Sequence, residues 1–413
     1  MMERYSEYKD SGVKWLGEIP SHWEVVRGLG VFSENKSKNT QLENSTVLSL
    51  SYGKIIVKKD IDSGLVPEEY SSYQIVRPGC IIVRSTDLQN DKTSLRIGYV
   101  CDEGIITSAY LGLQVKGNNN DKYLYYFLHD WDITKEIYRH GNGLRQSLSW
   151  NDLRDNSVLL PPLSEQDAIV RYLDSATSEI DKAIAMQQKM IDLLNERKQI
   201  IIQNAVTKGL DENVEMKESG IFCFGKIPKH WLIKGWNHIF YNLDKLRKPI
   251  SAEQRSRRNP QYDYYGASGV IDKIDYYNVD DKILLIGEDG ANLKMRNLPL
   301  VYKANGKIWV NNHAHILKPI EDNYDYMAYL METFDYNPYI TGSAQPKLSQ
   351  EQLGMVRLCV PPIEEQKKIV IYLEKRLKGF DSAITNCQRQ ITLLQERKQI
   401  IINEVVTGKV RVS

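Results

Sequence analysis

The chain contains a gapless internal repeat, and this repeat limits the folds that are open to it. Residues 159–210 align with residues 359–410 at a constant offset of 200, and 24 of the 52 aligned positions are identical. The heptapeptide ERKQIII stands in both copies, at Glu196–Ile202 and at Glu396–Ile402. A chain of 413 residues is also longer than one ordinary domain core supports. We therefore expect a protein built as two halves.

The pattern within each copy predicts a long helix. A Pro-Pro pair comes first, and apolar residues then recur three or four positions apart with no further proline. We expect Ser164 to cap the first helix, because Glu165 and Asp167 follow it and suit a helix N-terminus. Gly209 and Gly408 stand where the two helices should end. Roughly 40 residues of helix make a rod of about 60 Å, with a seam narrow enough for a coiled coil.

A second, shorter repeat precedes each of two variable blocks. SGVKWLGEIPSHW at 11–23 matches SGIFCFGKIPKHW at 219–231, whereas the blocks that follow do not resemble each other. These blocks contain short β-type runs and are expected to form α+β or β-rich globules. A frame that is kept while its two globules diverge is typical of a recognition protein. The alternative is a protein-only coiled-coil adaptor, in which the helices serve as a scaffold or spacer.

One segment of the second block, KIWVNNHAHIL at 307–317, alternates like a single strand. That period would place Ile308 and Ile316 on one face and Trp309, His313 and His315 on the other. Two histidines at this spacing can ligate a metal, but no third ligand stands nearby, so we expect structural or surface histidines and no metal site. Asparagine and histidine beside an aromatic residue also suit contacts with base edges.

Composition and missing motifs exclude several classes of protein. The five cysteines are scattered without a Cys-x-x-Cys pair, and no run is apolar enough for a membrane span. These features predict a cytoplasmic protein without a disulfide framework. No phosphate-binding loop or complete dinucleotide loop occurs, so we expect a non-catalytic binder. A methyltransferase or nuclease fusion is a further alternative, which the missing motifs disfavour.

Positive charge is concentrated in loops although the formal net charge is only +1. The run KLRKPISAEQRSRR at 245–258 holds six Lys or Arg residues and one Glu. This composition suits phosphate contacts, and it equally suits a solvated surface loop.

The repeated motifs resemble the DNA specificity subunit of type I restriction–modification systems. The likeness is carried by SGVKWLGEIPSHW, LPPLSEQDAIVRYLD, LLNERKQIIIQNAVTKGL and their second copies, and it covers essentially the whole chain. GEDGANL (287–293), WVNNHAH (309–315) and SAQPKLS (343–349) look like one class of target-recognition domain. PGCIIVRST (78–86) and GIITSAYLGL (104–113) look like another class, which implies an asymmetric target.

The resemblance implies an α+β fold in which two long antiparallel helices, a coiled coil, separate two globular target-recognition domains with an internal pseudo-twofold repeat. The expected boundaries are 1–158 for the first recognition domain, 159–210 for the first helix, 211–358 for the second recognition domain and 359–413 for the second helix. The implied partners are double-stranded DNA, two adenine-N6 methyltransferase subunits and restriction or translocase subunits, with no membrane. S-adenosylmethionine, ATP and Mg²⁺ are expected in those partners, and no cofactor in this chain.

We expect DNA contacts to come from loop residues of both globules and no catalytic residue in either. In the first globule the candidates are Arg84, Ser85, Thr86, Lys92, Arg96, Tyr110 and Arg145. In the second globule they are Lys248, Arg255, Arg257, Arg258, Lys294, Asn312, His313, Gln345 and Lys347.

Overall fold

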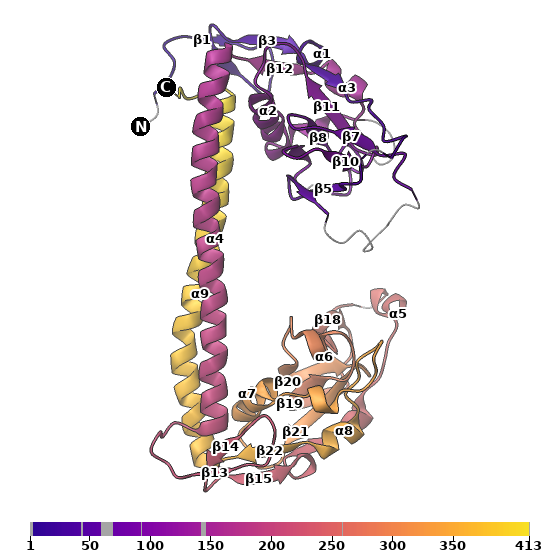
Figure 1. The fold of residues 1–413 in the computed structure, drawn as a ribbon. Helices are drawn as coiled ribbons and strands as arrows, with labels where there is room; N and C mark the ends of the chain where they lie inside the picture. The colour runs from indigo at the N-terminus through magenta and orange to yellow at the C-terminus, as the bar shows by residue number, and fades with distance from the viewer. Residues whose placement is uncertain are drawn as a thin grey trace. The chain divides into compact units, whose positions relative to one another are not determined.

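The chain divides into two compact units, each of which contains part of both long helices. The structure, a computed structural model, describes residues 3–42, 44–58, 69–91, 93–141, 146–257 and 259–412. The first unit comprises Met1–Gln188 and Arg389–Ser413, and the second unit comprises Lys189–Gln388. The boundary between the units falls within α4 (Leu163–Lys208) and α9 (Ile363–Val406), which are continuous helices (Figure 1).

The first unit packs small antiparallel sheets against one helix. Its largest sheet has the strand order β4-β11-β8-β9. The helix α2 begins after Asn120, whose side chain accepts hydrogen bonds from the amides of Lys122 and Tyr123. Residues of α2, of the sheet and of both long helices share one core. The elements before α4 are β1 (Tyr8–Asp10), β2 (Glu18–Pro20), β3 (Glu24–Arg27), α1 (Gly28–Val31), β4 (Phe32–Glu34), β5 (Leu48–Ser51), β6 (Lys54–Val57), β7 (Gln74–Val76), β8 (Ile81–Val83), β9 (Ile97–Tyr99), β10 (Gly104–Ile106), β11 (Leu111–Val115), α2 (Asp121–Ile133), η1 (Glu136–Arg139), α3 (Trp150–Arg154) and β12 (Ser157–Leu160).

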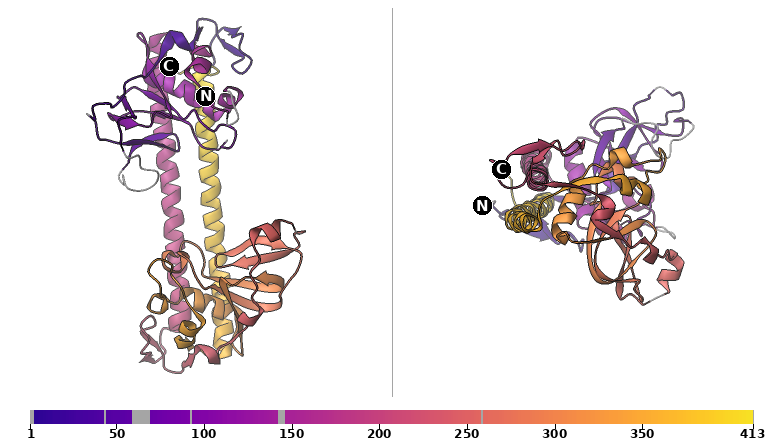
Figure 2. Two further views of the ribbon diagram at one scale, coloured as in Figure 1. Left: turned by 90° about the vertical axis from the view of Figure 1, so that its right-hand side faces the viewer. Right: turned by 90° about the horizontal axis from the view of Figure 1, so that it is seen from below.

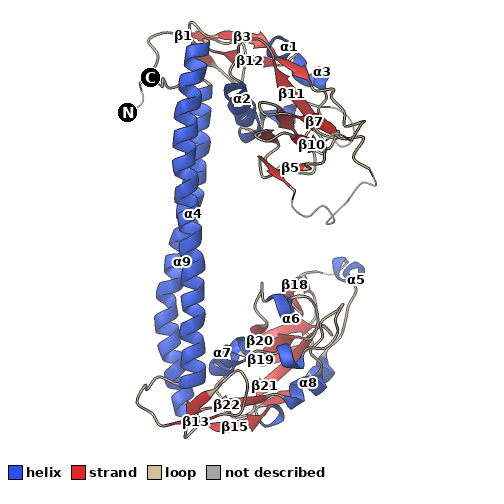
Figure 3. Ribbon diagram, viewed as in Figure 1, coloured by secondary structure: helices blue, strands red, loops and turns tan. Residues whose placement is uncertain are grey.

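The second unit is organised differently, around one mixed sheet of six strands in the order β16-β21-β19-β20-β17-β18 (Figure 3). The pair β17–β20 is parallel and the other pairs are antiparallel. Its elements before α9 are β13 (Met216–Glu218), β14 (Lys226–Pro228), β15 (Leu232–Gly235), η2 (Trp236–His238), β16 (Phe240–Asn242), η3 (Asp244–Leu246), α5 (Ala252–Ser256), β17 (Tyr262–Gly266), β18 (Gly269–Ile274), β19 (Val279–Gly287), α6 (Asn292–Met295), β20 (Val301–Val310), β21 (Ala314–Pro319), α7 (Tyr324–Thr333), η4 (Asn337–Tyr339), α8 (Gln350–Met355) and β22 (Arg357–Val360).

Within each unit the segments of α4 and α9 lie side by side and run antiparallel (Figures 1 and 2). In the first unit Lys398 Nζ lies 2.6 Å from Asp181 Oδ1. In the second unit Lys198 Nζ lies 2.6 Å from Asp381 Oδ1. The repeated lysine of ERKQIII therefore pairs with the repeated aspartate of the other copy, once in each unit. The predicted fold class, with two unlike α+β globules on a duplicated antiparallel helix pair, is confirmed.

The repeated motifs form the same clamp twice, at the start of each long helix. In the first unit Trp23 Nε1 donates to Glu165 at 3.0 Å, and His22 Nε2 lies 2.6 Å from the same carboxylate. In the second unit Trp231 Nε1 donates to Glu365 at 3.1 Å, and the ring of His230 repeats the second contact at 2.7 Å. The His-Trp pair of the short repeat thus holds the first turn of the long repeat.

The glutamine that follows each clamp glutamate connects the recognition globule to the frame. Gln166 accepts from the amide of Asn120 at 2.8 Å and donates to the carbonyl of Pro161 at 2.8 Å. Gln366 makes the matching pair of contacts, with the amide of Asn323 at 2.7 Å and the Pro361 carbonyl at 3.0 Å. Since Asn120 and Asn323 are the N-caps of α2 and α7, the repeated Glu-Gln pair fixes the same helix in both units.

Two expectations from the sequence are wrong. Ser164 is not the cap of α4, because the helix begins at Leu163 and the Pro162 carbonyl already accepts from the Glu165 and Gln166 amides. The segment 307–317 is not one strand: β20 ends at Val310, and β21 begins at Ala314. The predicted helix ends are confirmed, since α4 ends one residue before Gly209 and α9 ends two residues before Gly408.

Candidate nucleic-acid interface

Three turns that are far apart in the sequence meet at one edge of the sheet in the second unit. The Gly290 amide donates to the Pro346 carbonyl at 3.1 Å, and the Leu348 amide donates to the Glu288 carbonyl at 2.7 Å. The Glu288 amide in turn donates to the His313 carbonyl at 2.8 Å. GEDGANL, WVNNHAH and SAQPKLS therefore form one surface, which we call the three-turn cluster: residues 287–293, 309–315 and 343–349.

A charged network lies under this surface. Arg247, just after η3, forms an ion pair with Glu288, and Lys347 Nζ lies 3.1 Å from the other oxygen of the same carboxylate. Burial alone would raise the pKa of Glu288, but the hydrogen bond from Arg247 and the positive charges around it hold the pKa below its ordinary value. Arg247 Nη1 also donates to the Asn312 carbonyl at 3.2 Å. The network therefore ties the turns together through one ionised glutamate.

The cluster presents polar side chains to solvent, and several of the predicted DNA contacts lie there. Asn312, His313, Gln345 and Lys347 are exposed. Exposed Lys248 lies beside them, because its amide donates to the Val310 carbonyl at 3.1 Å and its carbonyl accepts from Trp309 Nε1 at 2.7 Å. Amide groups that can read base edges and ammonium groups that can contact phosphates are thus brought onto one surface.

The remaining predicted contacts of the second unit are distributed over α5 and α6. Lys294 is exposed on α6, which follows the Gly290 turn. Arg257, the residue after α5, is exposed and pairs with Glu253 of that helix. Arg255 is instead committed to internal contacts: its Nε lies 2.7 Å from Asp272, and its guanidinium stands 4.6 Å from the centre of the Tyr264 ring. Arg258 lies outside the described residues.

In the first unit the prediction that Arg96 contacts DNA is wrong. Its side chain is fully buried, and Nη1 donates to the carbonyls of Arg84 at 3.2 Å and Thr86 at 2.8 Å. Nη2 donates to the carbonyls of Asp87 and Asp91, and Nε donates to Tyr138 Oη at 3.1 Å. A guanidinium has five donors, and here each nitrogen is used by the protein itself. Arg96 organises the 84–91 loop from beneath.

Three other candidates of the first unit, Arg84, Ser85 and Thr86, belong to that loop, and Tyr110 lies between β10 and β11. Ser85 is buried, and its hydroxyl donates to the Ala109 carbonyl at 3.4 Å, so it does not face a ligand. Arg84, Thr86 and Tyr110 are partly exposed, and Arg84 Nη1 lies 3.3 Å from the Asp91 carboxylate. Lys92 and Arg145 lie outside the described residues. Among the candidates that the structure describes, the first unit therefore presents one partly paired arginine and two polar side chains, Thr86 from the loop and Tyr110 from the β10–β11 connection.

Sequence reasoning missed Arg247, Glu288 and Asp289. Arg247 stands inside the basic run 245–258, and the two carboxylates belong to GEDG, which by itself predicts only a turn. Asp289 lies 2.8 Å from His313 Nδ1, so it orients an exposed histidine of the cluster. The sequence feature that could have indicated the Arg247–Glu288 ion pair is the presence of a basic run and an acidic turn in the same globule.

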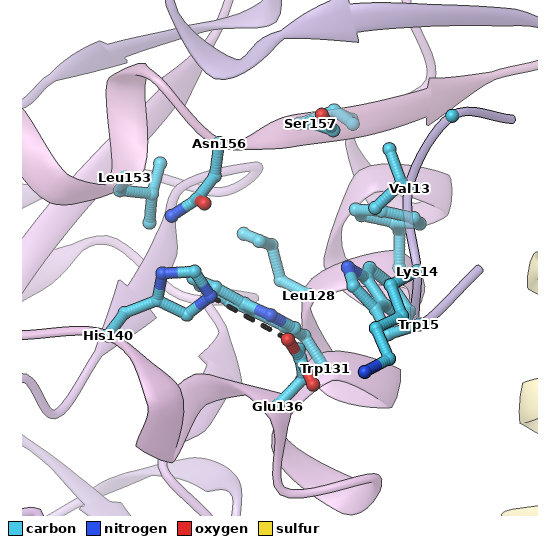
Figure 4. Close-up of a pocket in the computed structure, with 13 residues that line it drawn as sticks. Val13, Lys14, Trp15, Leu128, Trp131, Glu136, His140, Leu153, Asn156 and Ser157 are labelled. Carbon is cyan, nitrogen blue, oxygen red and sulfur yellow. Dashed lines mark ion pairs between the residues drawn. The ribbon is translucent and has the colours of Figure 1, made fainter.

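A cavity of about 340 Å³ in the first unit is separate from these surfaces (Figure 4). Trp15 from the short repeat lines it together with Trp131 and Leu128 of α2, and His140 and Glu136 face each other across its rim at 4.0 Å. Burial lowers the pKa of His140. The lining is mainly aromatic and aliphatic.

The fold and these surfaces define a two-unit recognition protein, and comparisons with known proteins agree. A model of the type I restriction modification DNA specificity domain matches residues 20–189 and 240–395. The putative type I restriction enzyme MjaX specificity subunit of Methanocaldococcus jannaschii is 24% identical, with 98% of both chains covered. The type I restriction enzyme MjaVIII specificity subunit of the same organism is also 24% identical, over 98% of this chain and 97% of the relative.

A solved structure supports the fold independently of sequence. It comes from work on the structural basis of complex assembly and conformational transition of the type I R-M system. Its TM-score is 0.67 at 14% identity, covering 94% of this chain and 98% of the other. The chain belongs to the family of type I restriction–modification DNA specificity subunits. No helix among the residues that the structure describes is long and apolar enough to span a membrane.

Proposed function

We propose that this chain reads an asymmetric, bipartite DNA site, with one short half-site for each unit and an unspecified spacer between them. The observation that carries the proposal is that the two units share the same contacts at their long helices but differ in the sheets that support recognition. The clamp and the lysine–aspartate pair repeat in both units, whereas the largest sheet is four-stranded and antiparallel in the first unit and six-stranded and mixed in the second. Two unlike surfaces on one duplicated frame imply two unlike half-sites.

In the second unit the three-turn cluster supplies chemistry suited to a duplex. The amides of Asn312 and Gln345 can pair with the N6 and N7 edge of adenine in the major groove. Lys248 and Lys347 can neutralise phosphates on either side of such a contact. A methylatable adenine in each half-site, on opposite strands, fits this arrangement.

The long helices supply two equivalent docking surfaces for methyltransferase subunits. Leu193 and Ile200 on α4 are half-exposed, and Leu393 and Ile400 on α9 are exposed to the same degree. Residues seven positions apart share one face of a helix, so each copy of the repeat presents the same apolar pair to solvent. Exposed apolar residues that are kept at equivalent positions in both copies are typical of a protein contact.

In the assembled complex the chain itself performs no catalysis. The methyltransferase subunits would bring S-adenosylmethionine and methylate N6 of adenine, and restriction subunits would bring ATP-driven translocation and cleavage with Mg²⁺. The role of this chain is then to place one methyltransferase beside each half-site.

Methylation-sensitive long-read sequencing tests the bipartite site. Genomic DNA from cells that express this chain with its methyltransferase should carry N6-methyladenine in one interrupted, non-palindromic motif. A continuous motif, a perfect palindrome or no methylation dependent on this chain would contradict the proposal, and the last result would favour a protein-only adaptor.

Variants of the second unit test which surface reads which half. Replacing Asn312 and Gln345 by Ala should relax one half-site, since each good base contact contributes about 1–3 kcal/mol of discrimination. The other half-site should keep its sequence. Substituting the exposed Asn118 of the first unit by Ala provides the control and should leave both halves unchanged. Relaxation of both halves, or of neither, would contradict the assignment to this cluster.

Aspartate substitutions test the docking surfaces. Leu193→Asp with Ile200→Asp should remove one methyltransferase from the complex, and Leu393→Asp with Ile400→Asp should remove the other. Each pair of substitutions removes two aliphatic side chains that the proposed contact would bury, so each contact should weaken by well over tenfold. Asn195→Asp with Gln199→Asp, which adds the same two charges at exposed neighbouring positions of α4, is the control. Mass photometry of the assembled complex would show a stoichiometry that stays at two if the surfaces are misassigned.

A further inference from the structure

A buried histidine lies below the three-turn cluster and contacts a residue of η3 and a residue of the cluster itself. His315, on β21, is fully buried. Its Nδ1 lies 2.6 Å from Asp244 Oδ2, and its Nε2 lies 2.8 Å from the carbonyl oxygen of Leu348. Asp244 begins η3, whose last two residues open the basic run 245–258, and Leu348 directly follows residues 343–347, which we call the SAQPK turn. One imidazole ring therefore joins the two segments that flank the proposed DNA-reading surface.

The chemistry of the two partners determines how many protons the ring carries. A main-chain carbonyl can only accept, so Nε2 must carry a hydrogen. Asp244 is also an acceptor, because its Oδ1 accepts from the Ile316 amide at 2.8 Å and its Oδ2 accepts from Asn242 Nδ2 at 3.3 Å and lies 3.3 Å from Arg247 Nη2. Nδ1 must then carry a hydrogen as well. A neutral ring in this geometry would point a lone pair at an oxygen atom, which is costly in a buried position.

The charges around the ring complete this account. Glu288, at the end of β19, has an oxygen 3.8 Å from Nε2. Arg247 pairs with both carboxylates, lying 3.3 Å from Asp244 and in contact with Glu288, and Lys347 pairs with Glu288 at 3.1 Å. The groups that face the ring are thus two carboxylates, and the cations that could oppose its charge are each bound to one of them. A buried charge is expected only where it is paired in this way.

We propose that His315 is a positioning residue held as a doubly protonated imidazolium, which fixes the SAQPK turn so that the second unit can discriminate its half-site. The ring does not reach DNA. It acts through Leu348, whose amide also donates to the Glu288 carbonyl, and so sets where Gln345 and Lys347 stand. The part of this proposal that concerns DNA rests on the proposed function, whereas the protonation state and the order of the turn do not.

The first test reads the proton directly in the unmodified full-length chain. Long-range ¹H–¹⁵N spectra of ¹⁵N-histidine-labelled protein, with His315 assigned by its loss in His315→Gln, should show two protonated ring nitrogens. A spectrum with one protonated and one bare nitrogen at pH 7 would overturn the proposal, whatever the DNA results are.

The second test measures the order of the turn by hydrogen exchange. Both donors of Gln are on one nitrogen, which cannot replace the two ring nitrogens of histidine, so His315→Gln should speed exchange of the Leu348 amide by about 10- to 100-fold, as expected for loss of a hydrogen bond to a charged group. Amides of the central strand β19, such as Leu284, should keep their wild-type rates. His238→Gln, which changes an exposed histidine on η2 of the same unit, is the matched control. Faster exchange throughout the sheet would show a general packing role and overturn the proposal.

The third test separates positioning from the proposed function. In the assembled complex His315→Gln should relax the second-unit half-site and leave the other half-site intact. If the turn loosens while both half-sites stay unchanged, the link between His315 and discrimination is wrong. If the wild-type complex has no bipartite motif at all, the proposed function fails, and the first two tests still decide the protonation state and its effect on the turn.

Discussion

The buried carboxylate of Asp130 makes the stability of the first unit depend on pH. Asp130 lies on α2 with no exposed surface, and both of its oxygens accept from Asn403 Nδ2 of α9 at 3.1 Å. Burial raises the pKa of Asp130, the bond from Asn403 and the charge of Lys409 only partly oppose this, and the pKa reaches about 6. In the unfolded chain it returns to about 3.8.

The sign and size of the effect follow from proton linkage. Between these two pKa values the folded state binds a proton that the unfolded state has lost, so the free energy of unfolding falls as pH rises. Each pH unit is about 1.4 kcal/mol, and the full shift therefore costs the folded state about 3 kcal/mol at pH 8. At pH 4.5 only about 1 kcal/mol of this cost is present, so the difference between the two conditions is about 2 kcal/mol.

Asp130→Asn removes the titration while keeping an oxygen that can accept from Asn403. Relative to the wild type, the variant should gain about 2 kcal/mol more at pH 8 than at pH 4.5, which for a unit of about 200 residues is a shift of roughly 4–8 °C. Calorimetry at the two pH values measures it, with hydrogen exchange on α2 peptides assigning the transition to the first unit. Asp102→Asn, at an exposed position of the same unit, should show no such difference. An equal effect of Asp130→Asn at both pH values would refute the reasoning.

Three further predictions test the frame and the loops. Arg96→Met should leave the carbonyls of the 84–91 loop without donors, speed hydrogen exchange there and relax the first-unit half-site, whereas unchanged exchange would contradict the internal role of Arg96. Glu165→Gln should lower the denaturation midpoint of the first unit by the equivalent of about 1–2 kcal/mol and leave the second unit unaffected, and Glu365→Gln should do the reverse. Gly209→Val should destabilise the second unit by about 2 kcal/mol or more in urea titrations, because Gly209 has φ +78° and its added carbon would meet Glu365 at 3.0 Å. Gly379→Ala, in open space on α9, should instead stabilise the unit by about 0.5–1 kcal/mol in the same assay.

The long helices could be predicted from the sequence because their signals are local. Apolar spacing of three and four, the Pro-Pro stop before each helix and a glycine after each helix all act within one or two turns. Ser164 shows the limit of such signals. A serine before an acidic residue suits a cap, but the proline two positions earlier already had a carbonyl in place to accept the first helical amides.

The turn between β20 and β21 could not be predicted from alternation, since the period of two runs through it without a break. The turn is made by Asn311, whose side chain accepts from the His313 amide at 2.8 Å, while its own amide donates to the Tyr265 carbonyl. The second of these contacts comes from a strand 46 residues earlier. A tertiary contact thus decides whether Asn311 continues a strand or ends it.

The roles of the arginines could not be predicted from the sequence, for a related reason. A guanidinium that contacts phosphates and one that is enclosed by carbonyls use the same donors, so the residue type does not distinguish them. Arg96 was expected to contact DNA, but carbonyl groups of the 84–91 loop enclose it. Arg255 forms an ion pair with Asp272. By contrast, the three motifs that the family resemblance grouped, GEDGANL, WVNNHAH and SAQPKLS, do meet in one cluster. Main-chain hydrogen bonds join them, and the spacing of the motifs along the sequence does not predict those bonds.

The division of labour between repeated and unrepeated residues has a consequence for how this chain can change its target. Some of the contacts that join each globule to the long helices are made by identical residues of the repeats: a tryptophan and histidine on a glutamate, and a glutamine on the N-cap amide of α2 or α7. Other contacts differ, such as Tyr126 with Asp174 in the first unit and Tyr326 with the Val206 carbonyl in the second. The cluster supported by His315, Arg247 and Glu288 has no counterpart among the repeated motifs. A replacement globule that presents an N-cap amide at the position of Asn120 or Asn323 can therefore keep the repeated contacts, whereas a point change inside the cluster disturbs a network whose charges depend on one another. On this reasoning a new half-site specificity is reached more readily by exchange of residues 232–360 than by stepwise substitution within them.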